Sequence, residues 1–385
     1  MTSPDAVRKS FVDMFGAEPR IFRAPGRVNL IGGHLDYNEG WVLPIAIDRS
    51  CFVAAKVRSD RLLRIHSVQM QETFECHLDD PRPQQHHWSN YVRGVTWALR
   101  EAGESIAGAD FLISNDVPMG AGLSSSAALE VSTAFALLRL SDLKMDRVQL
   151  ARICQRAENE YVGMRCGIMD QLVACCGRRA HALLIDCRTL EIQPVPFDES
   201  SIAVVVANTM VKHALAASSE YNRRRTECDD AVARIRVVRP DIKTLRDVSW
   251  PEIEQLASTW PDNIRRRARH VTTEMLRVHA AAAALRKGDF AELGRLISEA
   301  HVSLDTDYEV SSTELNLMVA LAKQIPGLLG ARMTGAGFGG CTINLIRPND
   351  AAEFAARLAK SYEEKTRIKP DIYICRASDG VEEIV

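Results

Sequence analysis

The 385-residue chain lacks the features that mark a membrane-spanning, secreted or fibrous protein. No apolar run approaches the roughly 18 residues that are needed to span a bilayer. Residues 1–5 have neither the basic segment nor the apolar segment of a secretory signal. Internal repeats and low-complexity linkers are missing too. We therefore expect a protein that stays in the cytoplasm, where it is made, and that does not bind a membrane.

An excess of charge of one sign is also missing, because 48 Lys and Arg residues face 50 Asp and Glu residues, a net charge of −2. A chain so balanced has no molecule-wide field that would draw it to nucleic acid or to anionic lipid. Its 46% hydrophobic and 25% charged residues are typical of a globular protein, and its length allows two compact domains. We expect a small-molecule partner and no nucleic acid. The oligomeric state is not fixed by the sequence, although a monomer is favoured.

The ten cysteines include no CxxC pair. Most of them lie in apolar segments, such as residues 172–176, which end in Cys175 and Cys176. This distribution is typical of reduced, buried thiols in a cytosolic protein, and a chain of this length does not need disulfides to fold. We therefore expect free cysteines.

What the sequence does contain is three unusual glycine-containing stretches, the first at residues 23–40. Strand-like residues 21–23 precede its polar part and apolar residues 42–47 follow it, so its polar and charged side chains are concentrated in a turn between two buried elements. Arg27, His34 and Asp36 are among them. Such a loop is a good place for a ligand.

The second stretch, residues 115–130, leads from Gly120 and Gly122 through three serines into a helix start. A loop of this kind offers free backbone N–H groups and the positive end of a helix dipole, which are the requirements of a phosphate site. It is not a Walker loop, because no GK[ST] follows, and the G-x-G-x-x-G spacing of dinucleotide-binding folds fails. A serine N-cap after a glycine turn is the simpler alternative for this stretch alone.

The third stretch, residues 332–341, has four glycines within six residues and leads into a strand. These glycines let a backbone approach another group closely, either a ligand or the phosphate loop itself. A helix over residues 351–362 and a strand over residues 371–375 complete the pattern of an α+β domain.

Asp170 lies between apolar residues 168–169 and 172–173, so burial is expected. A buried carboxylate needs a cation, a hydrogen-bonding partner or a functional reason, although a helix cap or a satisfied core carboxylate would also explain it. A phosphate loop, a buried aspartate and a polar loop with Arg27, His34 and Asp36 together suggest phosphoryl transfer to a polyhydroxylated acceptor.

The three stretches resemble, in order, the three motifs of the GHMP small-molecule kinases, and residues 26–38 are similar to the galactokinase signature in particular. Residues 166–171, 218–225, 267–271 and 307–311 also resemble galactokinase segments in family order, so the resemblance covers nearly the whole chain. It implies a two-domain α+β fold, with an N-terminal domain like the second domain of ribosomal protein S5 (residues 1–195), a ferredoxin-like C-terminal domain (residues 196–385) and an active site between them. The implied reaction is ATP-dependent phosphorylation of the anomeric hydroxyl of D-galactose.

The same resemblance implies the site residues. Asp170 and Arg27 match the catalytic pair, and Asp170 either accepts the proton of the anomeric hydroxyl or mainly orients it while Arg27 stabilises the developing charge. Mg²⁺, bound with ATP, would be held by Ser126 and Glu158, in keeping with its preference for one or two hard oxygen ligands from protein. Trp88, which as a lone aromatic would be expected in the core, matches the position against adenine. The implied nucleotide residues are Trp88, Pro118, Gly120, Ala121, Gly122, Leu123, Ser124, Ser125 and Ser126, and the implied sugar residues are Gly33, His34, Asp36, Gly167, Asp170 and Tyr221.

Two positions depart from the family pattern. Gly33 stands where galactokinases carry the glutamate that contacts the sugar's 6-hydroxyl, and Asp305 stands where they usually carry arginine. Three acceptors stay open: D-galactose, which we place first, with water in the space left at Gly33; L-arabinose, which has no C6 group; and galacturonate, whose carboxylate a glutamate would repel. A non-catalytic sensor of sugar and ATP is the alternative from another class. The continuous run Ser126-Ala127-Ala128 favours an enzyme.

Overall fold

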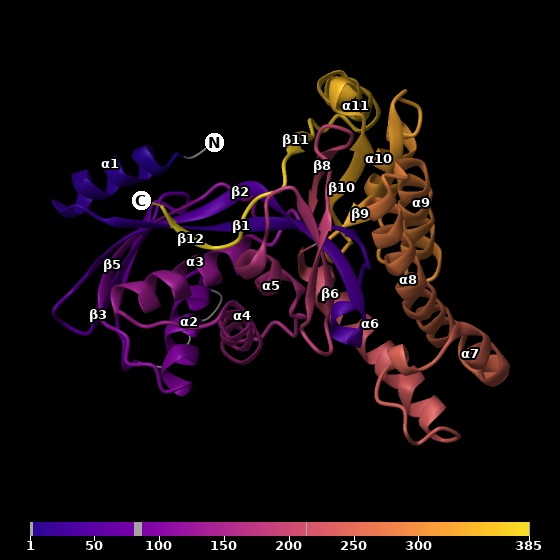
Figure 1. Cartoon of the computed structure of the whole chain (residues 1–385), viewed down its shortest axis with the longest axis horizontal. Helices are drawn as coiled ribbons and strands as arrows, with labels where there is room; N and C mark the ends of the chain where they lie inside the picture. Colours follow the sequence, from indigo (N-terminus) through magenta and orange to yellow (C-terminus); the bar gives the residue numbers. More distant parts are fainter. Residues whose placement is uncertain (1–2, 81–86, 213, 385) are drawn as a thin grey trace.

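A computed structural model describes residues 3–80, 87–212 and 214–384 of the chain. It contains an eight-stranded sheet of order β12-β1-β2-β5-β3-β4, in which β6 also pairs with β2 and β7 with β6, and a four-stranded sheet of order β11-β8-β10-β9 (Figure 1). Helices pack on both sheets, so the predicted two-part α+β fold class is confirmed. The strands of the larger sheet are β1 (Arg20–Ile31), β2 (Trp41–Val57), β3 (Leu62–Ser67), β4 (Glu72–His77), β5 (Ala109–Asn115), β6 (His181–Asp186), β7 (Ile192–Pro196) and β12 (Glu382–Ile384), and those of the smaller sheet are β8 (Ala203–Lys212), β9 (Leu328–Thr334), β10 (Gly339–Ile346) and β11 (Asp371–Cys375).

Both faces of the larger sheet are covered. Successive side chains of a strand point to opposite sides, so neighbouring residues of one strand enter different clusters. On β1, Phe22 enters the main core, whereas Ile21 packs in a small cluster with Phe11 on the other face. Figure 1 shows α1 above this sheet and α2 to α5 below it. The helices of this half are α1 (Pro4–Phe15), α2 (Asn90–Glu101), α3 (Ser125–Leu140), α4 (Arg147–Arg156) and α5 (Met169–Cys176).

The smaller sheet carries the second half of the chain. Its strands pack with α10 and α11 around a separate apolar cluster that includes Phe354 and Tyr362. The long helices α8 and α9 lie together on its other side, where α9 contacts β9. The chain then returns, since β12 pairs antiparallel with β1 of the larger sheet. The helices of this half are α6 (Ala214–Arg236), α7 (Trp250–Leu256), α8 (Asp262–Lys287), α9 (Phe290–Thr306), α10 (Thr313–Ala322) and α11 (Ala351–Thr366).

The antiparallel pairing of β1 with β2 is irregular where the first glycine stretch lies. Register shifts occur between Pro25 and Arg27 and again between Asn29 and Ile31. At the first of these shifts, a side-chain carbon on Gly26 would come within 2.7 Å of the Leu123 carbonyl oxygen. The glycine therefore lets β1 run against the loop that precedes α3, and the Arg27 N–H donates to the same carbonyl at 3.1 Å. This contact brings the first and second glycine stretches together.

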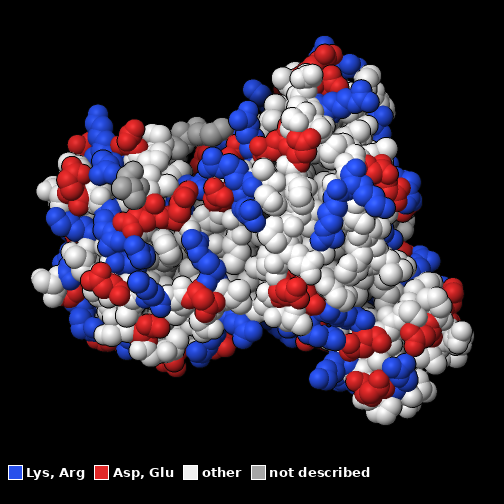
Figure 2. Space-filling model, viewed as in Figure 1, with Lys and Arg blue, Asp and Glu red and all other residues white. Residues whose placement is uncertain are grey.

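Surface charge and cysteines agree with the composition. Figure 2 shows basic and acidic side chains intermixed over the visible face. All ten cysteines are free and most are buried, as predicted. No helix in the described ranges is both long enough and apolar enough to cross a membrane.

Candidate active site

Arg27 and Asp170 form a two-pronged ion pair at the centre of the site. Arg27 Nε and Nη2 donate to the two carboxylate oxygens of Asp170 at 2.8 and 2.9 Å, and Arg27 Nη1 donates to the Gly122 carbonyl at 2.6 Å. Asp170 lies in the first turn of α5, where the helix dipole favours a negative charge. The Arg27 side chain is buried, whereas that of Asp170 is 27% exposed. The pair therefore presents to an accessible space a carboxylate whose charge is balanced by Arg27.

Ser124 is a third member of this group; the sequence predicted it as a nucleotide residue and did not predict its contact with Asp170. Its hydroxyl donates to Asp170 Oδ2 at 2.6 Å. Its backbone is in the left-handed region, with φ of 62°, and its side chain makes no capping hydrogen bond to α3. Ser124 thus holds the N-cap position of α3 that the sequence offered as the simpler alternative, but its hydroxyl donates to Asp170 and does not cap the helix.

The phosphate loop and the third glycine stretch lie against each other. A side-chain carbon on Gly335 would come within 2.8 Å of the Gly122 Cα, and one on Gly340 within 3.2 Å of the Ala121 carbonyl oxygen. Of the two partners that the sequence left open for these glycines, the structure shows the phosphate loop. A cavity of about 390 Å³ is left beside them, lined by Arg27, Asp170, Gly120, Gly122, Leu123, Ser124, Ser125, Ser126, Glu158 and residues 334–340 except Gly335.

Trp88 lies at a second cavity, of about 250 Å³, which shares Gly120, Ser125 and Ser126 with the first. Its indole Nε1 donates to Glu72 Oε2 at 2.7 Å, so the polar edge of the ring is fixed and the rest of the ring is partly buried. Because this cavity adjoins the start of α3, it has the position that a base would take when its phosphates lie at the helix N-terminus.

Glu158 and Ser126 meet next to the phosphate loop. Glu158 is buried in a π-helical turn, residues 157–162, and burial followed by the charge of Asp170 raises its pKa to about 7, while the Ser126 hydroxyl donates to it. Gln171 Nε2 donates to Glu158 at 2.7 Å and to Glu130 at 3.1 Å. Hence two buried carboxylates lie here with an amide between them. The sequence did not identify Glu130 or Gln171, although Glu130 is four residues after Ser126 and so on the same face of α3.

Asp36 and Gly167 are in direct contact. A side-chain carbon on Gly167 would come within 1.9 Å of Asp36 Oδ2, so only glycine fits beside this carboxylate. Burial, and then the charge of Asp170, raise the pKa of Asp36 to about 6. Both residues line a further cavity, of about 430 Å³, in which Asp170 does not take part.

His34 and Tyr221 stack near this contact, with ring centroids 5.6 Å apart. Burial lowers the pKa of His34 to about 3, so the imidazole is neutral at physiological pH. Its Nδ1 lies 2.9 Å from the Tyr37 hydroxyl, which in turn lies 2.7 Å from that of Tyr308. Its Nε2 is buried and makes no hydrogen bond of normal geometry within the described ranges, although the ring has a weak polar contact with the Ala336 backbone. That nitrogen can serve a ligand.

The two departures from the family pattern have different surroundings. A side-chain carbon on Gly33 would come within 2.8 Å of Arg332 Nη2 and 3.1 Å of Leu304 Cδ2. The space left by the missing side chain is thus filled by protein, which corrects our expectation of room for water there. Asp305 accepts a hydrogen bond from Asn316 Nδ2 at 2.8 Å and so faces α10.

Known proteins are similar to this chain over nearly its whole length. The family described as "Galactokinase galactose-binding signature" matches residues 9–57, "GHMP kinases N terminal domain" matches residues 90–178, and "GHMP kinases C terminal" matches residues 281–364. The chain is 46% identical to a galactokinase of Roseiflexus sp. (strain RS-1), over 100% of this chain and 98% of that one. It is 44% identical to a galactokinase of Chloroflexus aggregans (strain MD-66 / DSM 9485), over 97% and 95%.

Solved structures show the same likeness. The crystal structure of Lactococcus lactis galactokinase complexed with galactose superposes with a TM-score of 0.94 at 35% identity, and each chain is covered completely. A mevalonate kinase structure, at 17% identity, superposes with a TM-score of 0.64 over 93% of this chain and 99% of that one. The second likeness concerns the fold alone.

Proposed function

The chain belongs to the galactokinases of the GHMP kinase family, and from this we propose that it transfers the γ-phosphoryl group of ATP to the anomeric (C1) hydroxyl of D-galactose, giving galactose 1-phosphate. The observation that carries the proposal is the Arg27–Asp170 pair, in which Arg27 of the galactose-binding signature binds both Asp170 and the Gly122 carbonyl of the phosphate loop. A sugar hydroxyl bound at Asp170 would therefore lie next to a nucleotide phosphate bound at the phosphate loop. This arrangement is what phosphoryl transfer requires, since catalysis of that reaction is mainly positioning and electrostatic stabilisation.

Asp170 would receive the C1 hydroxyl. Its two oxygens already accept two hydrogen bonds from Arg27 and one from Ser124. A carboxylate has about four acceptor sites, so at least one stays available for the sugar. In this position Asp170 orients the hydroxyl toward the phosphoryl group and accepts its proton as the bond to phosphorus forms, while Arg27 compensates the negative charge.

The ring hydroxyls would be read by the cluster around Asp36. The Asp36 carboxylate accepts hydrogen bonds, the neutral His34 offers its buried Nε2, and Tyr221 provides a ring face and a hydroxyl. Because Gly167 has no side chain, its backbone can lie directly beside the Asp36 carboxylate. These groups suit a sugar with the galactose configuration on the C1 to C4 side.

ATP would bind along the loop from Pro118 to Ser126, with adenine in the cavity at Trp88. Ser126 and Glu158 fit Mg²⁺, because a hydroxyl and a buried carboxyl group within hydrogen-bonding distance of each other offer the hard oxygen ligands that this ion prefers. No group of three or more His, Cys, Asp and Glu side chains in the described ranges could hold a metal, which also suits an ion that takes most of its ligands from phosphate and water. When bound, Mg²⁺ would neutralise phosphate charge.

The relatives are galactokinases, which favours galactose over L-arabinose and galacturonate, and the intact Arg27–Asp170 pair favours an enzyme over a sensor. The test is ADP release with the three sugars and Mg-ATP, with kcat/KM as the measurement. We expect galactose to give the highest value. A protein that binds galactose and ATP but releases no ADP would be the sensor. A monomeric state and a cytoplasmic location stay predictions from the sequence.

A further inference from the structure

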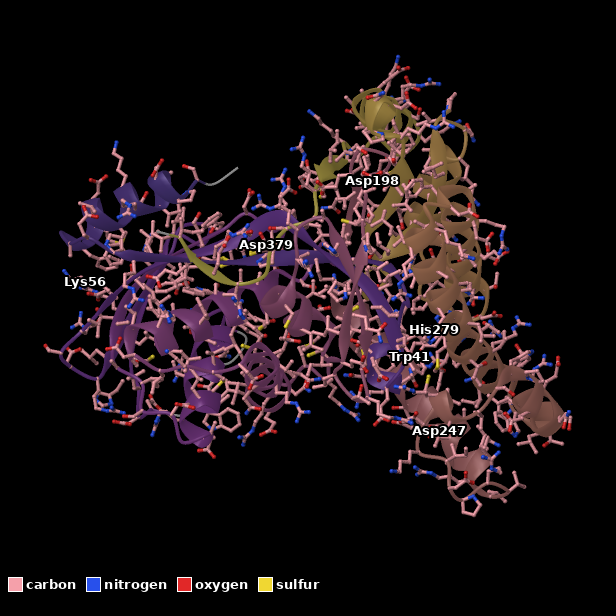
Figure 3. The ribbon with its side chains drawn as sticks, viewed as in Figure 1. Trp41, Lys56, Asp198, Asp247, His279 and Asp379 are labelled. Atoms are coloured by element: carbon pink, nitrogen blue, oxygen red, sulfur yellow. The ribbon has the colours of Figure 1, made fainter. Side chains whose placement is uncertain are left out.

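A buried charged cluster contacts the loop between β1 and β2 at Gly32 and Gly33, and the reaction described above does not use this cluster. His270 and Glu274 of α8 are fully buried, and Arg332 of β9 is 1% exposed. Burying charged groups is unfavourable unless each one is paired. Helix α8 reaches this place beside β2, where Trp41 and His279 lie side by side with ring centroids 4.6 Å apart (Figure 3). The cluster thus links the second half of the chain to the loop between β1 and β2.

Glu274 binds the loop through its backbone. Its Oε1 accepts the N–H of Gly32 at 2.9 Å and that of Gly33 at 3.3 Å. Its Oε2 accepts Arg277 Nε at 2.7 Å, and Arg332 Nη1 lies 3.7 Å from Oε1. Burial opposes the charge of Glu274, but Arg277, then His270 and Arg332, outweigh it and hold its pKa at about 2. The group is therefore a carboxylate that grips two consecutive peptide N–H groups.

His270 binds the same dipeptide from the carbonyl side. Its Nε2 lies 3.0 Å from the Gly33 carbonyl oxygen, and its Nδ1 lies 2.9 Å from the Ser303 hydroxyl. A carbonyl only accepts, so the proton must be on Nε2. Burial lowers the pKa of His270 to about 4, which leaves Nδ1 unprotonated at neutral pH. The one proton of the Ser303 hydroxyl can then point to Nδ1 or to Asp307 Oδ2, which lies 3.3 Å away. Two side chains one helical turn apart on α8 thus hold three polar groups of Gly32 and Gly33.

The loop needs this support because its backbone is unusual. Gly32 has φ of +97°, and a side-chain carbon there would come within 2.9 Å of the Trp41 carbonyl oxygen. His34 has φ of 61°, the left-handed region that residues other than glycine avoid. Gly33 joins these two residues, so the orientation of its peptide groups sets the direction in which the His34 side chain points. A small rotation there would move the imidazole away from the sugar.

We propose that His270 and Glu274 are positioning residues for galactose. They fix the peptide groups on both sides of Gly33, and through them they hold His34 and Asp36 toward the acceptor sugar. The inference rests on the proposed function, since it needs a sugar at His34. It predicts that loss of these hydrogen bonds raises KM for galactose and leaves KM for ATP unchanged. In the described part of the chain the hydrogen bonds of His270 and Glu274 go to residues 32 and 33 and to side chains of α8 and α9, and not to the phosphate loop. A merely structural role would lower stability and affect both substrates alike.

The test compares two replacements of similar size. In His270→Gln the side-chain amide reaches the place of Nε2 and can still donate to the Gly33 carbonyl, whereas in His270→Asn it reaches only the place of Nδ1. Thr272→Val is the matched control on the same helix, because among the described residues the Thr272 hydroxyl bonds only to the α8 carbonyls of Ala268 and Arg269. All three are measured by kcat, by KM for galactose and for ATP, and by thermal melting.

We expect His270→Asn to raise KM for galactose about tenfold, the effect of one lost hydrogen bond in the aligned loop. His270→Gln should stay within about threefold of wild type, and KM for ATP should stay within about twofold in both. Thr272→Val should lower the melting temperature without moving either KM. The proposal is overturned if the Asn and Gln variants have the same KM for galactose, or if Thr272→Val raises it as much as His270→Asn does. If His270→Asn does not fold, His270→Gln decides. A tenfold rise in KM for galactose in His270→Gln would also overturn the proposal, and a KM close to that of wild type would support it.

Failure of the proposed function gives a different result. If wild-type protein releases no ADP with galactose, the sugar assignment is wrong, whatever the variants do. Galactose binding by calorimetry then replaces KM in the same comparison. Wild-type turnover of galactose with no difference between the His270 variants would refute the positioning role alone.

Discussion

Replacing Asp36 by asparagine should raise the free energy of unfolding and also raise KM for galactose, and both effects follow from the loss of one buried carboxyl group. Burial, followed by the charge of Asp170, raises the pKa of Asp36 from 3.8 to about 6. The folded state therefore binds a proton at Asp36 more tightly than the unfolded state does. The stability from this group is fully present below pH 3.8 and is lost as the pH rises through about 6.

The magnitude follows from the shift. A rise of about two pKa units corresponds to about 3 kcal/mol of lost stability at pH 8, which is an upper value because the half-buried carboxyl keeps some contact with water. At pH 5 the loss is about half as large, since the group is then mostly protonated in the folded state. Asparagine has the same shape without the charge. It therefore removes the loss without disturbing the backbone of Gly167, which has no room to move toward this side chain.

Urea unfolding of the sugar-free proteins at pH 5 and pH 8 measures the effect. Asp36→Asn should gain up to about 3 kcal/mol at pH 8 and about 1.5 kcal/mol at pH 5. Asp186→Asn is the contrasting control. Burial opposes the charge of Asp186, but the hydrogen bonds from Arg246 and from the backbone N–H groups of Arg188 and Thr189 together outweigh it and lower its pKa to about 2. That variant should lose stability by a similar amount at both pH values.

Activity of the same variant completes the test. KM for galactose should rise about ten- to hundredfold in Asp36→Asn, because a charged hydrogen-bond acceptor is lost. A gain in stability that is equal at pH 5 and pH 8 would refute the reasoning about the carboxyl group. An unchanged KM would remove Asp36 from the sugar contacts.

Three further predictions concern the reaction centre. Asp170→Ala should lower kcat by about 10²- to 10⁴-fold while nucleotide binding, measured by calorimetry, stays nearly intact; near wild-type kcat would remove its catalytic role. Ser126→Ala should raise the magnesium concentration required at saturating galactose, and an unchanged magnesium titration would exclude Ser126 as a ligand. Gly33→Glu should, relative to Gly33→Ala, raise kcat/KM for galactose and lower it for galacturonate, with a modest fall for L-arabinose. A common factor for all three sugars would show that position 33 does not read the substituent on C5.

Much of the site was predictable because its residues are neighbours in sequence. Gly120 and Gly122 before three serines predicted the loop and a helix start after the serines, and α3 begins within them, at Ser125. The apolar flanks of Asp170 predicted a carboxylate that needs a partner. Both signals act over a few residues, through backbone conformation and burial. The resemblance to a known family then supplied the roles that such local patterns cannot distinguish.

Long-range contacts could not be predicted in this way. Glu274 holds Gly32 across 242 positions of the chain, yet in the sequence it is one acidic residue on a long charged helix. Nothing local shows that α8 turns this residue inward, because its inward face is fixed by packing against β2 and α9. The return of β12 to pair with β1 is hidden for the same reason.

Gly33 shows how a correct sequence observation can lead to a wrong picture of space. A missing side chain suggested an empty pocket, but Arg332 Nη2 and Leu304 stand where the side chain would begin. The guanidinium is fully buried and has Glu274 as its nearby counter-charge. A glutamate at position 33 would have to displace Arg332 and would compete with Glu274 for it. Its effect on the sugar therefore has to be separated from its effect on the loop. Gly33→Ala serves that purpose, because it adds the crowding without the charge, and we expect it alone to lower the melting temperature.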